Sequence, residues 1–350
     1  MKVQTLFTFL FIFTSVFGFS DSVYNKLVEI AHYAKIAYCS VEPYFQDGPL
    51  GKACPDIDFC DATNQSSTQI AEVVRPNFLE QEISGDSYVA INDETKKVYA
   101  VFRGSLSPGD FVTDITAFQC PYAPILKNNL KYEEFANISN HDQLRSAILS
   151  KADNETVCED CLVHCGVYVA FMKFIQDVYE TADPYLQKGY ELTVTGHSLG
   201  GGYALLGGVE FKLQGYEPLL ITYASLRVGN PSFNKWVDEI FQTEANAKIV
   251  GEGGDLPIPS YSRVYQETDI VPRLPPNIPN VLEYTHSGLR FQITKVLLPQ
   301  LKENVVFKGA SNNDANDGID INFQPGITFL LYQHLHEFTR ISWPCNDLDV

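Results

Sequence analysis

The stretch VTGHSLGGGYALL, which runs from Val194 to Leu206, places a single serine, Ser198, among closely spaced glycines. Glycine is costly in the interior of a strand or helix, so such a cluster indicates a backbone that turns sharply or is approached closely. A β-rich segment, residues 191–195, precedes the cluster, and residues 199–214 have the pattern of a helix. The sequence therefore predicts a strand, a tight turn and a helix, with Ser198 in the turn.

The pattern around Ser198 is typical of a catalytic nucleophile. Gly196-His-Ser-Leu-Gly200 fits G-x-S-x-G, which is too short to be decisive alone, but a preceding strand and a following helix make it a nucleophile elbow. In that geometry the Ser198 hydroxyl projects above the sheet, and the amide of Leu199 faces a developing oxyanion. The alternative is a glycine-rich helix start with a buried serine.

A serine nucleophile needs an acid and a histidine, which follow the elbow in that order along the chain. Asp269 is the candidate acid, because it follows a segment typical of a strand and the prolines of residues 268–276 force the chain out of the sheet. Asp238, on an expected helix, and Asp255, in a Gly/Pro loop, are weaker candidates. The histidines that follow all of these acids are His286, His334 and His336.

The first 20 residues have the pattern of a secretory signal peptide. Lys2 supplies a positive charge, residues 6–17 are apolar, and residues 16–18 or 18–20 offer a cleavage site. The alternative is an uncleaved membrane anchor, for which the apolar run is short. We expect a soluble, secreted mature chain, residues 21–350, that forms a single domain, because no Pro/Gly/Ser linker separates two cores.

The chain is acidic, with 25 Lys and Arg against 43 Asp and Glu and a net charge of −18. Removing the expected signal peptide, which holds one lysine and no acid, leaves 24 minus 43, or −19. This charge argues against a nucleic-acid partner and disfavours anionic lipid, although solubility alone also accounts for it.

The cysteine content agrees with an extracellular location. There are 8 cysteines, an even number that suits an oxidising compartment. Cys158-x-x-Cys161 would indicate a metal or redox site in a cytosolic chain, but only one such pair is present, so we expect a disulfide and no metal. Candidate glycosylation sequons begin at Asn64, Asn137 and Asn154.

Along the chain, strand-like and helix-like segments alternate, which predicts an α/β fold with a largely parallel sheet. An N-terminal helix over residues 23–38 is followed by a loop, residues 42–68, and by an antiparallel hairpin, residues 87–103. Residues 122–155 have weak periodicity and are expected to form a surface excursion. The remaining expected strands are residues 191–195, 219–224 and 247–250, and the remaining expected helices are residues 167–179, 199–214 and 231–241.

Several separated motifs together resemble the class 3 lipases of fungi and yeasts, which have the α/β-hydrolase fold, over about residues 23–345. In chain order the motifs are Val101-Phe-Arg-Gly-Ser105, His164-Cys-Gly166, Gly196-His-Ser-Leu-Gly-Gly201, Arg227-Val-Gly-Asn230 and Asp269-Ile-Val-Pro-Arg-Leu-Pro-Pro276. The resemblance implies a central, mostly parallel sheet flanked by helices, with a lid segment over the active site.

The resemblance also implies roles for individual residues. Ser198 is the expected nucleophile, Asp269 the acid that orients the base, and His334 the general base, because His334-Leu-His-Glu-Phe338 matches the family's His-Leu-x-x-Phe-like segment. His336 stays a competitor, since a slip of two residues in a strand points a side chain to the same side. Ser105 and Leu199 are expected to form the oxyanion hole, and no metal or organic cofactor is needed.

Disulfide partners follow from the same resemblance. It implies that Cys39 pairs with Cys345, Cys54 with Cys60 and Cys158 with Cys161. This leaves Cys120 and Cys165, which are not expected from the family's usual pattern, and we predict that they pair with each other.

Substrate class is the least determined property. Leu106 to Phe118 lies where the family has an amphipathic lid, and it presents either an apolar face to lipid or an ordinary helix face to the core. The leading hypothesis is a secreted, monomeric triacylglycerol lipase that acts at an oil–water interface through transient lid contact. The alternatives are a feruloyl or other carboxylesterase, a phospholipase A1, and a catalytically silent secreted binding protein.

Overall fold

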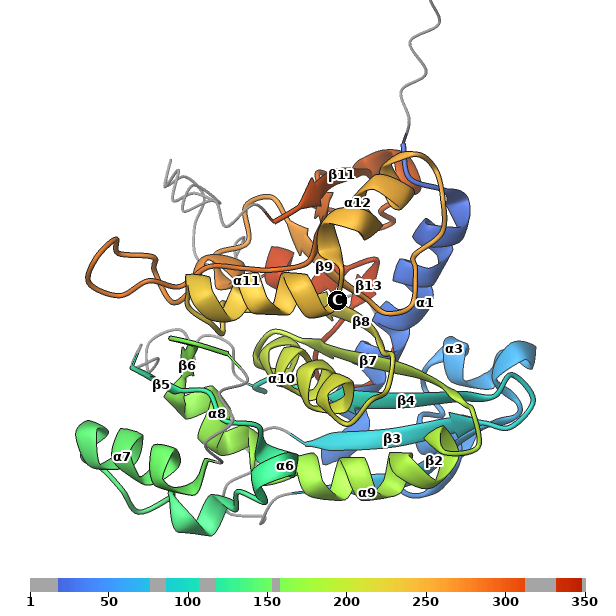
Figure 1. Cartoon of the computed structure of the whole chain (residues 1–350). Helices are drawn as coiled ribbons and strands as arrows, with labels where there is room; N and C mark the ends of the chain where they lie inside the picture. Colours follow the sequence, from blue (N-terminus) through green and yellow to red (C-terminus); the bar gives the residue numbers. More distant parts are fainter. Residues whose placement is uncertain (1–17, 76–85, 107–117, 153–157, 312–331, 348–350) are drawn as a thin grey trace, which may run out of the picture.

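The computed structural model describes residues 18–75, 86–106, 118–152, 158–311 and 332–347 (Figure 1). Most of the expected signal peptide, the central part of the expected lid and Asn154 lie outside these residues. Within the described ranges, no helix combines the length and the apolar character needed to cross a bilayer.

A nine-stranded sheet forms the centre of the molecule, in the order β1-β2-β3-β4-β7-β8-β9-β10-β11. The five strands from β4 to β10 are parallel, and the pairs at either end are antiparallel. Its strands are β1 (Gly48–Pro49), β2 (Thr68–Val74), β3 (Ser87–Asn92), β4 (Lys97–Phe102), β7 (Glu191–His197), β8 (Leu219–Tyr223), β9 (Ser260–Gln266), β10 (Leu289–Ile293) and β11 (Val305–Ala310). Small two-stranded sheets join β5 (Gln119–Pro121) to β6 (Leu162–His164) and β12 (His336–Glu337) to β13 (Thr339–Arg340).

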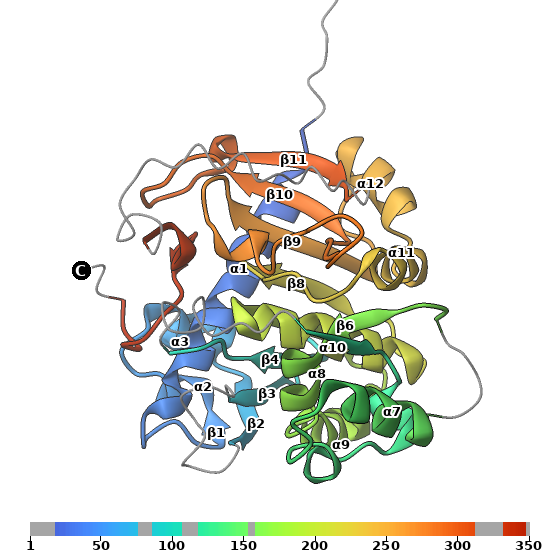
Figure 2. The same ribbon diagram turned by 90° about the vertical axis from the view of Figure 1, so that its left-hand side faces the viewer.

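Helices cover both faces of the sheet (Figures 1 and 2). The α-helices are α1 (Asp21–Ile36), α2 (Leu50–Ala53), α3 (Asp58–Asp61), α6 (Ile125–Asn128), α7 (His141–Lys151), α8 (Cys165–Phe171), α9 (Ile175–Leu186), α10 (Leu199–Leu213), α11 (Pro231–Ile240) and α12 (Thr243–Gly251). The 3-10 helices are η1 (Ala37–Val41), η2 (Thr63–Gln65), η4 (Tyr132–Glu134), η5 (Val271–Arg273) and η6 (Lys302–Asn304).

Two hydrophobic cores lie on opposite faces of the sheet. Side chains alternate across a strand, so β4 sends Ala100 and Phe102 into the core beneath α8, α9 and α10. It sends Tyr99 and Val101 into the core beneath α1. α1 begins where the Ser20 side chain accepts a hydrogen bond from the Val23 amide, 3.2 Å away, and it buries one apolar face. Both faces of the parallel centre are therefore covered, as a buried parallel sheet requires.

The structure confirms the predicted α/β fold and the hairpin of β3 and β4, and it corrects two local predictions. Residues 247–250, expected to be a strand, belong to helix α12, which buries Val250 beside β11. A run of a few apolar residues is too short to show either the two-residue repeat of a strand or the longer repeat of a helix. The helix expected over residues 167–179 is divided into α8 and α9, because Phe174 leaves helical geometry and turns its ring onto Tyr203.

The expected excursion, residues 122–155, is ordered in its described part, residues 122–152, by contacts with α10. The buried carboxylate of Glu210 accepts hydrogen bonds from the Tyr122 hydroxyl (2.8 Å) and from the amides of Ile125 (2.9 Å) and Leu126 (3.0 Å) at the start of α6. Residues 122–152 follow β5 and contain α6, η4 and α7, so the segment is compact although its periodicity is weak.

The structure contains four disulfides in the pairs that the sequence analysis expects, namely Cys39–Cys345, Cys54–Cys60, Cys120–Cys165 and Cys158–Cys161. Cys39–Cys345 joins η1 to the C-terminal segment, and Cys120–Cys165 joins β5 to the start of α8. Asn64 and Asn137, the two glycosylation candidates within the described residues, are exposed.

Candidate active site

Ser198 lies in the turn between β7 and α10, with φ 58° and ψ −125°. This is a strained conformation for a residue that is not glycine. Its backbone N–H donates to the carbonyl of Tyr223 on the neighbouring strand β8, 2.9 Å away. Ser198 is fully buried beneath the described side chains. The predicted strand, tight turn and helix are thus present around this residue.

Glycines allow the turn to press against strand β4. A Cβ on Gly196 would lie 2.1 Å from the Gly200 carbonyl oxygen, and one on Gly200 would lie 2.2 Å from the Phe102 carbonyl oxygen. A Cβ on Gly104 would lie 3.1 Å from the Ser198 Cβ. The close approach brings the end of β4, and with it the buried Ser105, alongside the serine.

Asp269 follows β9, as the sequence predicts, and its carboxylate is buried. One oxygen, Oδ1, accepts the backbone N–H of Val271 at 2.9 Å. The loop after Asp269 is held by Arg227, whose Nη1 donates to the carbonyls of Arg273 (2.8 Å) and Pro275 (3.1 Å). This contact gives the Arg227-Val-Gly-Asn230 motif a structural role that its pattern alone did not indicate.

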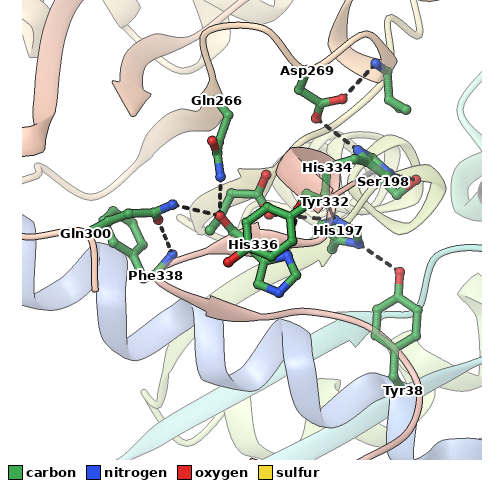
Figure 3. A network of polar contacts seen from close by, with 12 residues as sticks. Tyr38, His197, Ser198, Gln266, Asp269, Gln300, Tyr332, His334, His336 and Phe338 are labelled. Carbon is green, nitrogen blue, oxygen red and sulfur yellow. Dashed lines mark hydrogen bonds and ion pairs between the residues drawn. The ribbon is translucent and has the colours of Figure 1, made fainter. Parts of the chain in front are cut away.

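His334 lies between the serine and the aspartate (Figure 3). Its Nε2 is 2.9 Å from Ser198 Oγ and its Nδ1 is 2.9 Å from Asp269 Oδ2. In such a line of groups, the imidazole can take the hydroxyl proton while the oxygen attacks a carbonyl, and the carboxylate can stabilise the imidazolium that forms.

The two competing histidines lie elsewhere. His336 stacks its ring on Tyr332, with 3.8 Å between ring centroids, and its Nδ1 is 2.6 Å from the Tyr332 carbonyl. His286 contacts the carbonyl of Pro272 through Nε2 at 2.6 Å, and burial lowers its pKa well below the usual value. Of the three histidines, only His334 contacts both Ser198 and Asp269.

Two glutamine side chains hold the main chain just after His334 (Figure 3). The carbonyl of His336 accepts from Gln266 (2.5 Å) and Gln300 (3.0 Å), and the amide of Phe338 donates to Gln300 (2.7 Å). The carbonyl of His334 itself accepts from His197 Nε2 at 2.7 Å. Sequence reasoning missed these glutamines, because isolated glutamines carry no motif.

Sequence reasoning also missed a cluster of buried polar side chains beneath His334. It comprises Tyr38, His197 and Glu337, all almost completely inaccessible to solvent. Burial, followed by the neighbouring His334, lowers the pKa of His197 well below its usual value. Burial, followed by the charge of Asp269, raises the pKa of Glu337 well above its usual value. The lowered pKa of His197 keeps its imidazole neutral near pH 7. The sequence offered a local signal for His197 alone, because it precedes Ser198, and none for Tyr38.

No group of histidine, cysteine, aspartate or glutamate side chains that could hold a metal ion occurs in the part of the chain described.

The sheet, the turn after β7 and the three aligned side chains have the architecture of an α/β hydrolase. The chain belongs to the class 3 lipase family, which it matches over residues 99–278. It is 29% identical over 338 residues to the Saccharomyces cerevisiae protein named "Putative lipase LIH1", with 92% of each chain covered. It is 28% identical over 216 residues to a lipase of Rhizomucor miehei, which covers 60% of this chain and 45% of that protein.

Solved structures agree with the fold. The Lip2 lipase of Yarrowia lipolytica superposes with a TM-score of 0.65 at 26% identity, covering 94% of this chain and 98% of that one. The triacylglyceride lipase of Rhizomucor miehei superposes with a TM-score of 0.63 at 23% identity, covering 93% and 98% of the two chains, and this likeness concerns the fold alone.

Proposed function

We propose that this protein is a serine ester hydrolase in which Ser198 is the nucleophile, His334 the general base and Asp269 the acid that orients the base. The observation that carries the proposal is the continuous contact from hydroxyl to imidazole to carboxylate, with both distances 2.9 Å. His334 takes the proton as Ser198 attacks an ester carbonyl, an acyl-enzyme forms, and water then releases the acid.

The oxyanion hole is proposed to consist of Ser105 and Leu199. Ser105 follows β4, whose end packs against the turn of Ser198, and Leu199 is the first residue of α10. The first amides of a helix have no acceptor within the helix and lie at the positive end of its dipole. Both positions therefore suit donation to the negative oxygen of a tetrahedral intermediate.

The proposed substrates are long-chain acylglycerols, with triacylglycerol first. Membership of the class 3 lipase family supports a lipid ester, and the relatives include a Gibberella zeae protein named as a secreted mono- and diacylglycerol lipase, 26% identical over 186 residues. Secretion is part of the proposal, and it is supported by that relative, by the four disulfides and by the N-terminal sequence pattern.

Replacing the nucleophile tests the chemistry. Ser198→Ala is expected to remove all measurable esterase activity above background, because neither neighbouring group can replace the hydroxyl. Ser262→Ala is the matched control, since Ser262 is also fully buried but lies in β9 and its hydroxyl has no hydrogen-bond partner among the described residues. Hydrolysis of a soluble aryl ester by purified mature protein, with thermal unfolding as the folding check, is the measurement. Retained activity in Ser198→Ala would refute the proposal.

A second experiment tests the substrate class. Initial rates are compared on emulsified triglycerides of increasing chain length, on partial glycerides, on phospholipid and on aryl esters below and above their solubility limit. A lipase is expected to show a rise in rate when the ester forms an interface and a preference for long-chain acylglycerols. Equal rates on both sides of the solubility limit would favour an esterase, and preference for phospholipid would favour a phospholipase A1.

A further inference from the structure

The imidazole of His197, the residue before the nucleophile, has both of its nitrogens engaged. Nδ1 is 2.8 Å from the hydroxyl of Tyr38, and Nε2 is 2.7 Å from the main-chain carbonyl of His334 (Figure 3). A carbonyl only accepts, so Nε2 carries the proton. Because His197 is neutral, Nδ1 then accepts, and the Tyr38 hydroxyl is the donor. The carbonyl of His334 thus fixes the tautomer of His197, and Tyr38 supplies the matching donor to Nδ1.

The same hydroxyl also contacts the strand end that carries Ser105. The backbone N–H of Gly104 donates to the Tyr38 oxygen, and a Cβ on Gly104 would lie 2.6 Å from that oxygen and from the His197 carbonyl oxygen. Burial raises the pKa of Tyr38, so its hydroxyl keeps its proton and stays a donor across the physiological range. One side chain of η1 thus touches the turn before the nucleophile and the segment before Ser105.

The carboxyl of Glu337 lies near Nε2 of His197. Its Oε2 lies 3.8 Å from His197 Nε2, and neither of its oxygens has a hydrogen-bond partner among the described residues. At 3.8 Å Glu337 Oε2 is too far from Nε2 for a hydrogen bond, so the carbonyl of His334, 2.7 Å away, is the acceptor of the Nε2 proton.

We propose that Tyr38 and His197 are positioning residues, which fix the main chain of His334 and so the reach of its imidazole to Ser198. The inference rests on the function proposed above. Loss of the Tyr38 hydroxyl leaves the buried Nδ1 of His197 without a donor, so the ring keeps only its contact with the carbonyl of His334. The ring then moves to find another donor, and this displaces the carbonyl and with it the imidazole of His334. A shift of the general base away from the hydroxyl of Ser198 lowers the rate of the chemical step.

The test is Tyr38→Phe, which keeps the ring in its packed position and removes only the hydroxyl. We expect kcat on a soluble aryl ester to fall by about tenfold or more at nearly unchanged KM, because the substrate site is untouched and the base is displaced. The rate is expressed per active site, counted by covalent titration with a fluorescent alkyl fluorophosphonate, so that misfolded protein does not enter the value.

Tyr88→Phe is the matched control. Tyr88 is also fully buried and its hydroxyl also makes a hydrogen bond, 2.8 Å long, but to the carbonyl of Tyr33 in the core beneath α1. This variant is expected to lower the melting temperature about as much as Tyr38→Phe and to leave kcat per titrated site unchanged.

A double variant, Tyr38→Phe with His197→Gln, separates positioning from packing. The side-chain amide of glutamine donates from Nε2 and has no buried ring nitrogen that needs a donor from position 38, so we expect kcat to recover several-fold over Tyr38→Phe alone. The inference is overturned if Tyr38→Phe keeps kcat within twofold of the wild type, if Tyr88→Phe loses as much, or if the double variant shows no recovery. Wild-type protein that neither reacts with the fluorophosphonate nor hydrolyses the ester would instead refute the proposed function.

Discussion

Ser198 is held in a conformation that costs about 1–3 kcal/mol for a residue other than glycine. The hydrogen bond from its amide to Tyr223 and the contact of the turn with β4 offset this strain. The contact depends on glycine, because the nearest atoms to a Cβ on Gly200 belong to the main chain of Phe102, Arg103 and Gly104. Main-chain atoms of a central strand cannot rotate away as a flexible side chain can.

Replacement of Gly200 tests this dependence. Gly200→Ala is expected to prevent folding or to lower the melting temperature severely, because its Cβ would lie 2.2 Å from the Phe102 carbonyl oxygen. Gly251→Ala is the matched control, since Gly251 is also helical and the nearest atom to its Cβ, in Phe307, is at 3.7 Å, an ordinary contact. The control should be neutral or more stable by about 0.5–1 kcal/mol. Equal melting temperatures for the two variants would contradict this account.

The sequence predicted some residues of the candidate site and missed others. Ser198 and Asp269 carry local signals, a glycine pattern and a strand that ends in prolines, and these signals are physical. Choosing His334 over His336 needed the family resemblance, because a two-residue shift leaves both side chains on one side of a strand. Tyr38 contacts His197, 159 positions away in the chain, and His197 contacts His334, 137 positions away. A local sequence pattern does not reveal contacts between residues so far apart.

At the scale of elements, helix α10 begins directly after the nucleophile and also holds helix α6 in place. Glu210 lies more than two turns beyond Ser198 and fastens α6 through hydrogen bonds from the Tyr122 hydroxyl and from the amides of Ile125 and Leu126. Burial raises the pKa of Glu210 to about 7, and the three donors only partly offset that effect. The helix that presents the serine therefore also anchors the described part of the excursion, residues 122–152.

This contact predicts a pH dependence of stability. The pKa of Glu210 is about 7 in the folded protein and about 4.5 in the unfolded chain, so the folded state holds the proton more tightly. The resulting contribution to the free energy of unfolding is fully present below pH 4.5 and is lost as the pH rises to 7. Gln cannot titrate. The free energy of unfolding of the wild type minus that of Glu210→Gln should therefore fall between pH 4.5 and 8, by an amount on the order of 3 kcal/mol.

Urea unfolding at several pH values measures this difference. Glu252→Gln is the control, because Glu252 is exposed at the end of α12, and its difference from the wild type should stay flat. A flat difference for Glu210→Gln as well would show that the three donors fully offset the effect of burial on the pKa of Glu210.

Elements with a full amphipathic period were predictable, and those set by tertiary contacts were not. α1 buries one face and has a clear cap, and β3 and β4 form the expected hairpin. Strands β10 and β11 were missed because neither is bounded by a motif, and α12 was mistaken for a strand because its apolar run is short. The break between α8 and α9 depends on where the ring of Phe174 packs, which no local pattern records.

At the scale of the whole molecule, Cys39–Cys345 joins residues 306 positions apart, whereas Cys54–Cys60 spans 6. A crosslink restricts the unfolded chain more when it closes a longer loop, and the chain-entropy model gives about 6 kcal/mol for the first and about 2 kcal/mol for the second. The double variant Cys39→Ser with Cys345→Ser should therefore lose more stability than Cys54→Ser with Cys60→Ser.

Denaturant unfolding of both variants under non-reducing conditions checks this ranking, with the wild type as reference. Equal losses, or a larger loss from the short loop, would mean that local packing rather than loop length sets the effect of each bond.

The long disulfide also governs what happens if the chain is cut. Val281 is the most exposed of the large apolar side chains in the described part of the chain, in a loop between Asp269 and His334 where a protease has access. A cut there separates the nucleophile and the acid from the base in covalent sequence, yet Cys39–Cys345 still joins the two fragments. A nicked molecule would therefore migrate as two bands only after reduction, and in an oxidising medium its three proposed catalytic side chains would remain parts of one particle.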